Sequence, residues 1–383
     1  MRVVVAPDKF AGTLSSVEAA AAIAEGWSRR SPQDELIQAP MSDGGPGFVD
    51  VLHAARGGSL VACTTTDPYG RQVPGAVLLC REEGSPATAY VESAQALGLH
   101  LTTSADRRPL QASSAGLAVL LETARAAGAE RIVIGLGGSA VNDGGAGLLA
   151  ALGATAYDSA GATLDVTGGV ASVEGIARLD IADIVSAWQG IDIVAATDVD
   201  NPLLGLFGAV KTFGEQKGLA EEQLPYAEGR LSELVAAVDA TAPGEGARAA
   251  RAEGAGAAGG TAFALILLGA VREPGIGLVI EAVGLADRLA DADLVITGEG
   301  AFDFSSRSGK VPAGVAQAAG SVLAPCIALA GQVLVGARET RALGIDAAYA
   351  LVDLVGEEQA FADPRGALAS LAERVARTWS RRA

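Results

Sequence analysis

Short apolar runs alternate with longer alanine-rich stretches along most of the chain. The first pair is the clearest: residues 3–6 are apolar, a turn follows, and Ser15 stands three residues before Glu18. This spacing is a capping box, which predicts a helix that begins after Ser15 and runs to about Trp27. Similar apolar runs predict strands at residues 36–39, 131–135, 191–196, 294–297 and 327–330. Strands alternating with helices are typical of an α/β protein with a parallel, doubly wound sheet.

Two segments break this alternation. Residues 59–91 hold short alternating runs interrupted at residues 67–70 (Asp-Pro-Tyr-Gly), which predicts a β-hairpin region and a change of architecture. Residues 254–271 carry no charge, and a stretch of about 18 residues is long enough to span a membrane. Glycines interrupt its first half, so we expect a buried loop and a short helix there instead.

Composition and charge narrow the classes of function. The chain has 383 residues, half of them apolar, which is enough for two or three folded units. Its formal net charge of −17 opposes binding to nucleic acid and to anionic membranes. Three cysteines without a paired motif favour a reduced, cytoplasmic compartment, and the presence of only two histidines speaks against a histidine-rich metal site.

Acidic and glycine-rich turns follow most of the expected strands. They lie at residues 8–9, 41–45, 135–147, 197–202 and 297–300. In a parallel sheet, the loops after the strands meet at the carboxyl edge, where ligands bind. One such segment is ordinary turn sequence, whereas five of them on one edge predict a ligand site.

Lysine is rare in this chain, and its positions point to phosphate. Only four of the 28 basic residues are lysines, and three of these, Lys9, Lys217 and Lys310, stand in glycine- or acid-rich segments. An ammonium group contacts phosphate as a compact charge, whereas carboxylates hold Mg²⁺ and orient a hydroxyl group. The combination favours phosphate handling; the alternative is that these lysines are solvated turn residues.

Known nucleotide and metal motifs fit less well. Residues 309–310 (Gly-Lys) lack the upstream glycine and the following Ser or Thr of a P-loop. Residues 135–140 match a relaxed dinucleotide fingerprint, and Asp158 lies about 20 residues further on, which leaves an NAD-dependent dehydrogenase open. Residues 198–200 (Asp-Val-Asp) start like a calcium loop, but Pro202 follows where further ligands belong.

Taken together, these segments resemble the bacterial glycerate kinase family, in the same order and over nearly the whole chain. The resemblance rests on residues 6–10 (Ala-Pro-Asp-Lys-Phe), 42–45, 135–147, 198–205, 213–218, 254–260 and 297–300 (Thr-Gly-Glu-Gly), with Asp303, Gly309 and Lys310. It implies ATP- and Mg²⁺-dependent phosphorylation of D-glycerate to a phosphoglycerate. It also implies a two-domain α/β fold with the site in the cleft: residues 1–65 and 285–383 form a Rossmann-like parallel-sheet domain, and residues 66–284 form an inserted α/β domain.

Phosphoryl transfer needs alignment, cations on the phosphates and a group that accepts the hydroxyl proton. We therefore expect Asp198 as the base, Asp8 and Lys9 in catalysis, and Asp43 and Glu299 as Mg²⁺ ligands, with the base and metal roles interchangeable. Backbone N–H groups of residues 137–147 are expected at the nucleotide phosphates. The expected substrate- and nucleotide-binding residues are Ser42, Asp43, Gly44, Gly45, Gly137, Gly138, Ser139, Asn142, Asp143, Gly144, Asn201, Lys217, Asp303 and Lys310. Purely structural roles are the alternative for the helix-capping candidates Asp43 and Asp143 and for the turn candidates Ser139 and Asn142.

The chain departs from the family pattern at five positions where other members often carry charged or polar side chains. These are Ala11, Pro46, Ala115, Ala301 and Ser308. Each change removes a side chain that could contact substrate, so an inactive homologue that senses a metabolite or a nucleotide stays an alternative. The resemblance favours 2-phosphoglycerate as the product, whereas the residues themselves do not decide between O2 and O3 of glycerate, and they leave a homodimer open.

Overall fold

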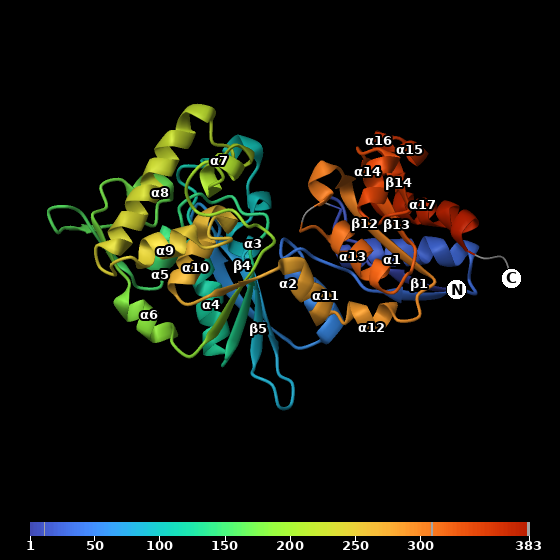
Figure 1. The fold of residues 1–383 in the computed structure, drawn as a ribbon, viewed down its shortest axis with the longest axis horizontal. Coiled ribbons are helices and arrows are strands. Elements are labelled where there is room, and N and C mark those ends of the chain that lie inside the picture. Colours follow the sequence, from blue (N-terminus) through green and yellow to red (C-terminus); the bar gives the residue numbers. More distant parts are fainter. Residues whose placement is uncertain (11, 308, 381–383) are drawn as a thin grey trace. The chain divides into compact units, whose positions relative to one another are not determined.

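The computed structural model describes residues 1–10, 12–307 and 309–380, and its chain divides into two compact units (Figure 1). Unit 1 comprises residues 1–43, 50–57 and 274–383, and unit 2 comprises residues 44–49 and 58–273. The expected boundaries after residue 65 and before residue 285 differ from this division. The first falls inside strand β3 (Ser59–Thr66), which belongs to the unit 2 sheet, and the second falls between helices α11 (Gly275–Ala282) and α12 (Leu285–Leu289) of unit 1.

Unit 1 is built on a parallel sheet. Among the described residues this sheet has five strands, in the order β14-β13-β12-β1-β2. The strands are β1 (Arg2–Val5), β2 (Glu35–Gln38), β12 (Leu294–Phe302), β13 (Cys326–Val333) and β14 (Ala347–Ala350). Because β1 pairs with β2 on one side and with β12 on the other, the strand order reverses between β1 and β12. The parallel sheet expected from the alternating pattern is therefore confirmed, and its topological switch point lies at β1 and β12.

The first helix of unit 1 begins as the sequence predicts. Ser15 Oγ accepts a hydrogen bond from the Glu18 N–H, and the Glu18 carboxylate accepts one from the Ser15 N–H, ahead of α1 (Ser16–Arg30). This helix packs against α17 (Pro364–Trp379), which comes from the other end of the chain (Figure 1). Both helices share a buried core with the apolar side chains of β1, β12 and β13, so the two chain ends stabilise one sheet.

The remaining helices of unit 1 are shorter. Helix α13 follows β12 and packs on that strand, and α11 and α12 both contact α13. Helix α2 crosses from unit 2 into unit 1 at its third residue. These helices are α2 (Phe48–Arg56), α13 (Val311–Ser321), α14 (Ala337–Ala342), α15 (Leu351–Val355) and α16 (Glu357–Ala362), with the 3₁₀ turn η7 (Phe304–Arg307).

Unit 2 contains a mixed sheet. In the described part of the chain its strand order is β11-β10-β6-β5-β4-β3, with β3, β4 and β5 antiparallel and the pairs from β5 to β11 parallel. The expected hairpin is β3 and β4, which turn at residues 67–70 and therefore confirm the predicted change of architecture. The further strands are β4 (Gln72–Cys80), β5 (Thr88–Glu92), β6 (Arg131–Gly135), β10 (Asp192–Ala196) and β11 (Val271–Glu273).

The position of Asp158 in unit 2 argues against a dinucleotide-binding site. The strand before Asp158 belongs to a small antiparallel sheet. It consists, among the residues described, of β8 (Thr163–Leu164), β7 (Thr155–Tyr157) and β9 (Arg178–Asp180). Asp158 follows β7, so it lies outside the sheet that holds β6, whereas a ribose-binding acid must end the neighbouring parallel strand. Moreover, α5 (Ala146–Ala151) begins only after the fingerprint at residues 135–140 has ended, whereas a dinucleotide-binding helix begins within the fingerprint. The dehydrogenase alternative therefore lacks its structural context.

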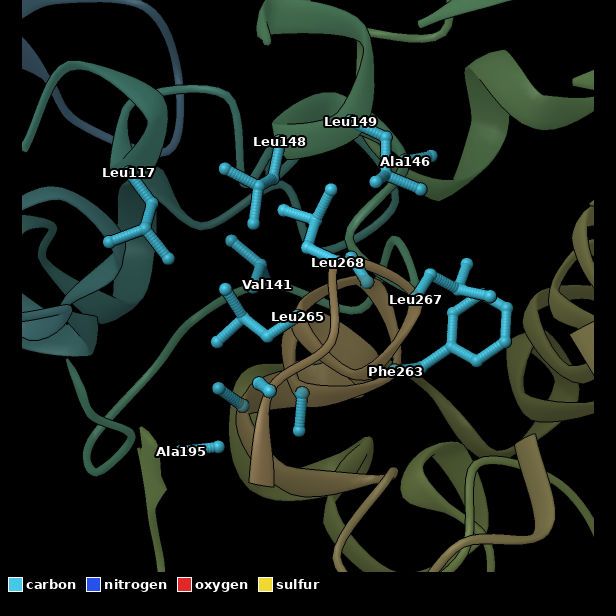
Figure 2. Close-up of a cluster of buried hydrophobic side chains, with 14 of the residues drawn as sticks. Leu117, Val141, Ala146, Leu148, Leu149, Ala195, Phe263, Leu265, Leu267 and Leu268 are labelled. Carbon is cyan, nitrogen blue, oxygen red and sulfur yellow. The ribbon is translucent and has the colours of Figure 1, made fainter. Parts of the chain in front are cut away.

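The uncharged stretch at residues 254–271 folds inside unit 2. It forms η6 (Ala257–Gly260), the short buried helix α10 (Thr261–Leu267) and the start of β11, as expected. Figure 2 shows Phe263, Leu265 and Leu267 of α10 among the apolar side chains of this core, with Leu148 of α5. Within the described residues, no helix has both the length and the hydropathy needed to cross a bilayer.

Unit 2 holds further helices around these sheets. The helices are α3 (Ala94–Leu97), α4 (Leu117–Ala126), α6 (Ala182–Trp188), α7 (Ala209–Phe213), α8 (Leu224–Asp239) and α9 (Glu245–Arg251). Short 3₁₀ turns lie at η1 (Leu99–Leu101), η2 (Ser104–Asp106), η3 (Val170–Val173), η4 (Glu215–Lys217) and η5 (Glu221–Gln223). Leu231, Leu234 and Val238 place one side of α8 in the unit 2 core.

The contact between α1 and α17 generates a stability prediction. Gly26 lies on the buried side of α1, where an added Cβ would clash with the backbone carbonyl of Ala369. Because backbone cannot move aside cheaply, Gly26→Ala is expected to lower the free energy of unfolding by about 2 kcal/mol or more, measured by denaturant titration. In the control Gly229→Ala, in α8, the new Cβ meets no atom within 4 Å, so helix propensity should raise stability by roughly 0.5–1 kcal/mol. Equal stability of Gly26→Ala and wild type would contradict this packing.

Candidate active site

The carboxyl ends of β1 and β12 bring two acidic residues to one edge of the unit 1 sheet. Asp8 lies in the turn after β1, and Glu299 lies within β12. The Asp8 N–H donates to the Gly298 carbonyl over 2.8 Å, and Thr297 Oγ1 donates to the Ala6 carbonyl over 3.0 Å. These bonds extend the strand pairing past the end of β1, and they fix both carboxyl groups at the switch point where ligands of open α/β sheets bind.

Lys9 joins the acidic side chains of unit 1. Its Nζ lies 3.6 Å from Asp8 Oδ1 and 3.6 Å from Asp43 Oδ1. The Lys9 backbone N–H also donates to Asp8 Oδ1 over 2.7 Å. We call Asp8, Lys9, Asp43 and Glu299 the acid–lysine group. The structure thus brings together four of the expected site residues, and it shows an ion-pairing role for Asp43.

The electrostatics of Asp8 and Lys9 follow from burial and from each other. Burial raises the pKa of Asp8 to about 6; the Lys9 ammonium opposes this rise, and the Asp43 carboxylate adds to it. Burial alone would lower the pKa of Lys9, but the carboxylates of Asp8 and Asp43 outweigh it and raise that pKa above its ordinary value of 10.5. Lys9 therefore stays positively charged at neutral pH.

Glu299 is a second carboxyl group of this edge whose pKa is raised. Burial raises its pKa to about 7, and the charges of Asp8 and Asp303 act in the same direction. The Ser306 hydroxyl donates to Glu299 Oε1 over 2.6 Å, and this bond together with the charge of Lys310 partly offsets the rise in pKa. Asp303 and Lys310 thus lie within electrostatic reach of Glu299, as the sequence led us to expect for one site. Ser306 was missed, because a serine in a short turn carries no distinctive signal.

The carboxylates of the acid–lysine group could hold a metal ion only together with ligands from outside the protein. Within the described residues, no cluster of three or more His, Cys, Asp and Glu side chains could hold a metal ion. Mg²⁺ usually binds proteins through one or two carboxylates and takes its other ligands from water and phosphate. Burial, and after it the repulsion from neighbouring carboxylates, raises the pKa of Asp8 and Glu299, and the charge of a bound cation would offset that repulsion.

The glycine segment after β6 lies in unit 2, and several of its amides already have acceptors there. The N–H groups of six residues donate within unit 2: Gly137 to Gly44 (3.2 Å), Ala140 to Leu97 (2.7 Å), Gly144 to Gly259 (3.0 Å), Ala146 to the Asp143 carbonyl (3.1 Å), and Gly145 and Gly147 to the Asp143 carboxylate (3.1 and 3.2 Å). These bonds fix the shape of the segment. A phosphate cradle formed by residues 137–147 would have to use its other amides.

The glycines of this region serve close backbone packing. Gly44 and Gly45 belong to unit 2, and Gly44 has a φ of +88°. A Cβ on Gly137 would lie 2.5 Å from the Cα of Gly45, so a side chain there would force the two backbone segments apart. The Glu92 carboxylate accepts the N–H groups of Gly47 and Val49 and holds the same segment.

Asp143 has a structural role at the start of α5. It is fully buried, and its carboxylate accepts hydrogen bonds from the Ser114 N–H and hydroxyl as well as from the Gly145 and Gly147 amides. Burial raises the pKa of Asp143, while these donors oppose the rise. The structural alternative for Asp143 is therefore supported. Ala115, one of the departures from the family pattern, donates its N–H to Ser113 Oγ beside this cluster.

Lys217 and Asn142 are buried next to this cluster. The Lys217 ammonium donates to the Val141 carbonyl over 2.7 Å, and only 4% of the residue is exposed. Burial lowers the pKa of Lys217 to about 7, and the nearby Asp143 opposes the fall. Asn142 Nδ2 donates to the Pro109 carbonyl over 3.5 Å, while its buried Oδ1 has no partner among the described residues.

The loop after β10 carries Asp198 and Asn201 in unit 2. Asp198 is half-buried, and the preceding Thr197 Oγ1 accepts the Val199 N–H. Asn201 Nδ2 donates to the Phe207 carbonyl and to Thr212 Oγ1, so this side chain holds its own loop. A role for Asp198 as base stays a prediction.

The five acidic and glycine-rich turns were expected at the edge of one sheet, but the strands that precede them belong to two different sheets. The turns after β1 and β12 belong to unit 1, and those after β6 and β10 belong to unit 2, because the strands that precede them pair in separate sheets. The turn after β2 (residues 41–45) passes from unit 1 into unit 2 at Gly44. Ser42 is fully buried in unit 1, and Ser139 and Gly138 pair with residues 98–99 of unit 2. The family departures at Ala11 and Ser308 lie outside the described residues.

Burial of Lys217 generates a prediction about stability and pH. Its folded pKa of about 7 lies below the ordinary value of 10.5, so between these pH values the unfolded chain binds a proton that the folded chain does not. The stability of wild type relative to Lys217→Met should therefore rise from pH 7 to pH 9, by at most about 1.4 kcal/mol per pH unit, and should be flat below pH 6. Thermal unfolding of both proteins at each pH measures this difference, and a difference that does not change with pH would show that Lys217 keeps its charge in the fold.

Comparison with known proteins identifies the family. The family model described as the glycerate kinase family matches residues 3–380. The chain is 38% identical to the glycerate kinase of Bacillus subtilis strain 168, over 92% of this chain and 90% of that protein. It is 36% identical to the glycerate 2-kinase of Escherichia coli K12, over 93% and 92% of the two chains. A crystal structure of a candidate glycerate kinase 2 from Salmonella typhimurium LT2 superposes with a TM-score of 0.79 at 35% identity, covering 99% of this chain and 98% of that one. This chain belongs to the glycerate kinase family.

Proposed function

We propose that this protein transfers the terminal phosphoryl group of ATP to glycerate and releases ADP and 2-phosphoglycerate. Membership of the glycerate kinase family supports glycerate as the acceptor. The E. coli relative is a glycerate 2-kinase, which supports transfer to O2 of glycerate. The observation that carries the proposal is the acid–lysine group: Lys9 Nζ lies 3.6 Å from the carboxylates of both Asp8 and Asp43, at the switch point of the unit 1 sheet. In the reaction a glycerate oxygen bonds to the terminal phosphorus, the bond from that phosphorus to the ADP oxygen breaks, and the hydroxyl proton passes to a base.

The roles in unit 1 follow from charge. Lys9 is held protonated by Asp8 and Asp43, so it would neutralise charge on the phosphoryl group that moves. Lys310 would add a second positive charge near Glu299. Asp43 and Glu299 would hold Mg²⁺, which when bound draws charge from the phosphate oxygens. Asp8 would orient the Lys9 ammonium through the contacts described above.

The roles in unit 2 are proposed for the same reaction. Asp198 follows the buried strand β10 and is partly exposed, which suits a base that accepts the glycerate proton. Gly138, Ser139 and Asn142 would contact phosphate or glycerate oxygens, with the Asn142 Oδ1 as the side-chain atom that needs a partner. Three free cysteines agree with a cytoplasmic location.

Product analysis tests the proposal directly. Purified protein with D-glycerate, ATP and Mg²⁺ should release ADP in a coupled assay, and phosphorus NMR should show the resonance of 2-phosphoglycerate. EDTA should abolish turnover if Mg²⁺ is required. Binding of ATP without turnover would favour the sensor alternative, and 3-phosphoglycerate as product would correct the position of transfer.

Two substitutions test the assignment of roles. Lys9→Ala should lower kcat by about 100-fold or more, because charge on the moving phosphoryl group loses its counter-ion. The control Lys211→Ala removes an exposed lysine and should leave kcat within about twofold. A Lys9→Ala defect confined to the KM for ATP would make Lys9 a binding residue. Asp198→Asn should lose turnover to a similar degree, and wild-type turnover in that variant would remove Asp198 from the mechanism.

A further inference from the structure

Unit 1 contains a cavity at the carboxyl ends of its strands. It has a volume of about 210 Å³, and its walls come from the turn after β1, from β12 and β13, and from helices α15 and α16. Phe10, Leu351 and Ala301 make the wall largely apolar, and Gln332 supplies an amide. Phe361 of α16 lines the cavity with 61% of its surface exposed, although phenylalanine side chains are usually buried in folded proteins.

The cavity adjoins the acid–lysine group within unit 1. Phe10 directly follows Lys9, and Ala301 lies two residues beyond Glu299 on β12. The pairing of β12 with β13 keeps one register through this region, with Glu299 opposite Ala330 and Ala301 opposite Gln332. Alternate residues of a strand share a face, so Ala301 and Gln332 lie on the face of Glu299, about 7 Å further along the strand.

The size and the side chains of the cavity suit a purine base better than glycerate or a whole nucleotide. Sites for whole drug-sized ligands measure roughly 300–1,000 Å³, so this cavity suits a fragment rather than a complete nucleotide. Glycerate is polar on every carbon atom and gains little from an apolar wall. A purine is flat and apolar on its faces, where an aromatic ring such as that of Phe361 stacks, and its edge carries donors and acceptors that match the amide of Gln332.

We propose that this cavity binds the adenine base of ATP, with its phosphates directed along β12 towards Glu299 and Lys9. The proposal rests on the proposed function, because that function supplies the nucleotide. It assigns Phe361 to stacking on the base and Gln332 to its edge. A long side chain at position 301 would enter the cavity, so the small side chain of Ala301 leaves room for the base.

Substitution at the exposed ring tests the assignment. Phe361→Ala should raise the KM for ATP about tenfold and leave kcat and the KM for glycerate within about twofold, since stacking contributes to binding of the base alone. Ala301→Leu should raise the KM for ATP at least as much by filling the cavity. The control Leu323→Ala truncates an apolar side chain that is 92% exposed and precedes the amino end of β13, at the opposite edge of the sheet, and should change neither constant.

A binding measurement separates this proposal from the proposed function. In calorimetric titrations, Phe361→Ala should bind ADP about tenfold more weakly than wild type, whereas inorganic tripolyphosphate, which has phosphates but no base, should bind both proteins equally. Wild-type affinity of Phe361→Ala and Ala301→Leu for ADP would overturn the proposal, as would an equal loss of affinity for tripolyphosphate. An inactive wild type would refute the kinase reaction, yet the ADP titrations would still decide whether the cavity binds the base.

Discussion

The contact of one ammonium group with two carboxylates at the end of β1 is the constraint on which the site depends. Asp8 and Asp43 would repel each other, and both the burial of Asp8 and that repulsion disfavour its charged form. Lys9 stabilises the charged form of Asp8, and the two carboxylates in turn keep Lys9 protonated despite its partial burial. The turn after β1, the turn after β2 and strand β12 must all keep their places for this arrangement, so the register of the parallel sheet determines the electrostatics.

In unit 2, glycines and charged residues of the same types fix the packing of backbone segments. Its glycine segment approaches other backbone closely, and the segment is fixed by amides that donate to Gly44, Leu97, Gly259 and the Asp143 carboxylate. Asp143 and Lys217 are both buried; Asp143 accepts hydrogen bonds from Ser114 and from backbone amides, and Lys217 donates to the Val141 carbonyl. Acidic and basic residues beside glycines therefore form an electrostatic site in unit 1 and a structural anchor in unit 2.

The strands, the capping box at Ser15 and the family could be predicted from the sequence because each depends on local pattern or on motif order. The division of the acidic turns between two sheets could not, since strands of both sheets have the same short apolar pattern and only long-range pairing separates them. For the same reason Lys9 and Lys217 look alike in the sequence, as lysines near acids or glycines. In the structure the two lysines differ in burial. Lys9 stays charged beside carboxylates, whereas burial lowers the pKa of Lys217 to about 7. Ser306 acts on Glu299 through a turn that no local signal marks.

The central claim is that the carboxyl groups around Lys9 receive a divalent cation together with the phosphates of a nucleotide. Calorimetric titration of ADP into wild type, Asp43→Asn and Glu299→Gln, each with Mg²⁺ and with EDTA, tests it most directly. The account predicts that Mg²⁺ strengthens ADP binding to wild type by about tenfold or more and that either substitution removes most of this gain. An equal gain from Mg²⁺ in all three proteins would contradict the account, because the metal would then bind the nucleotide without these side chains.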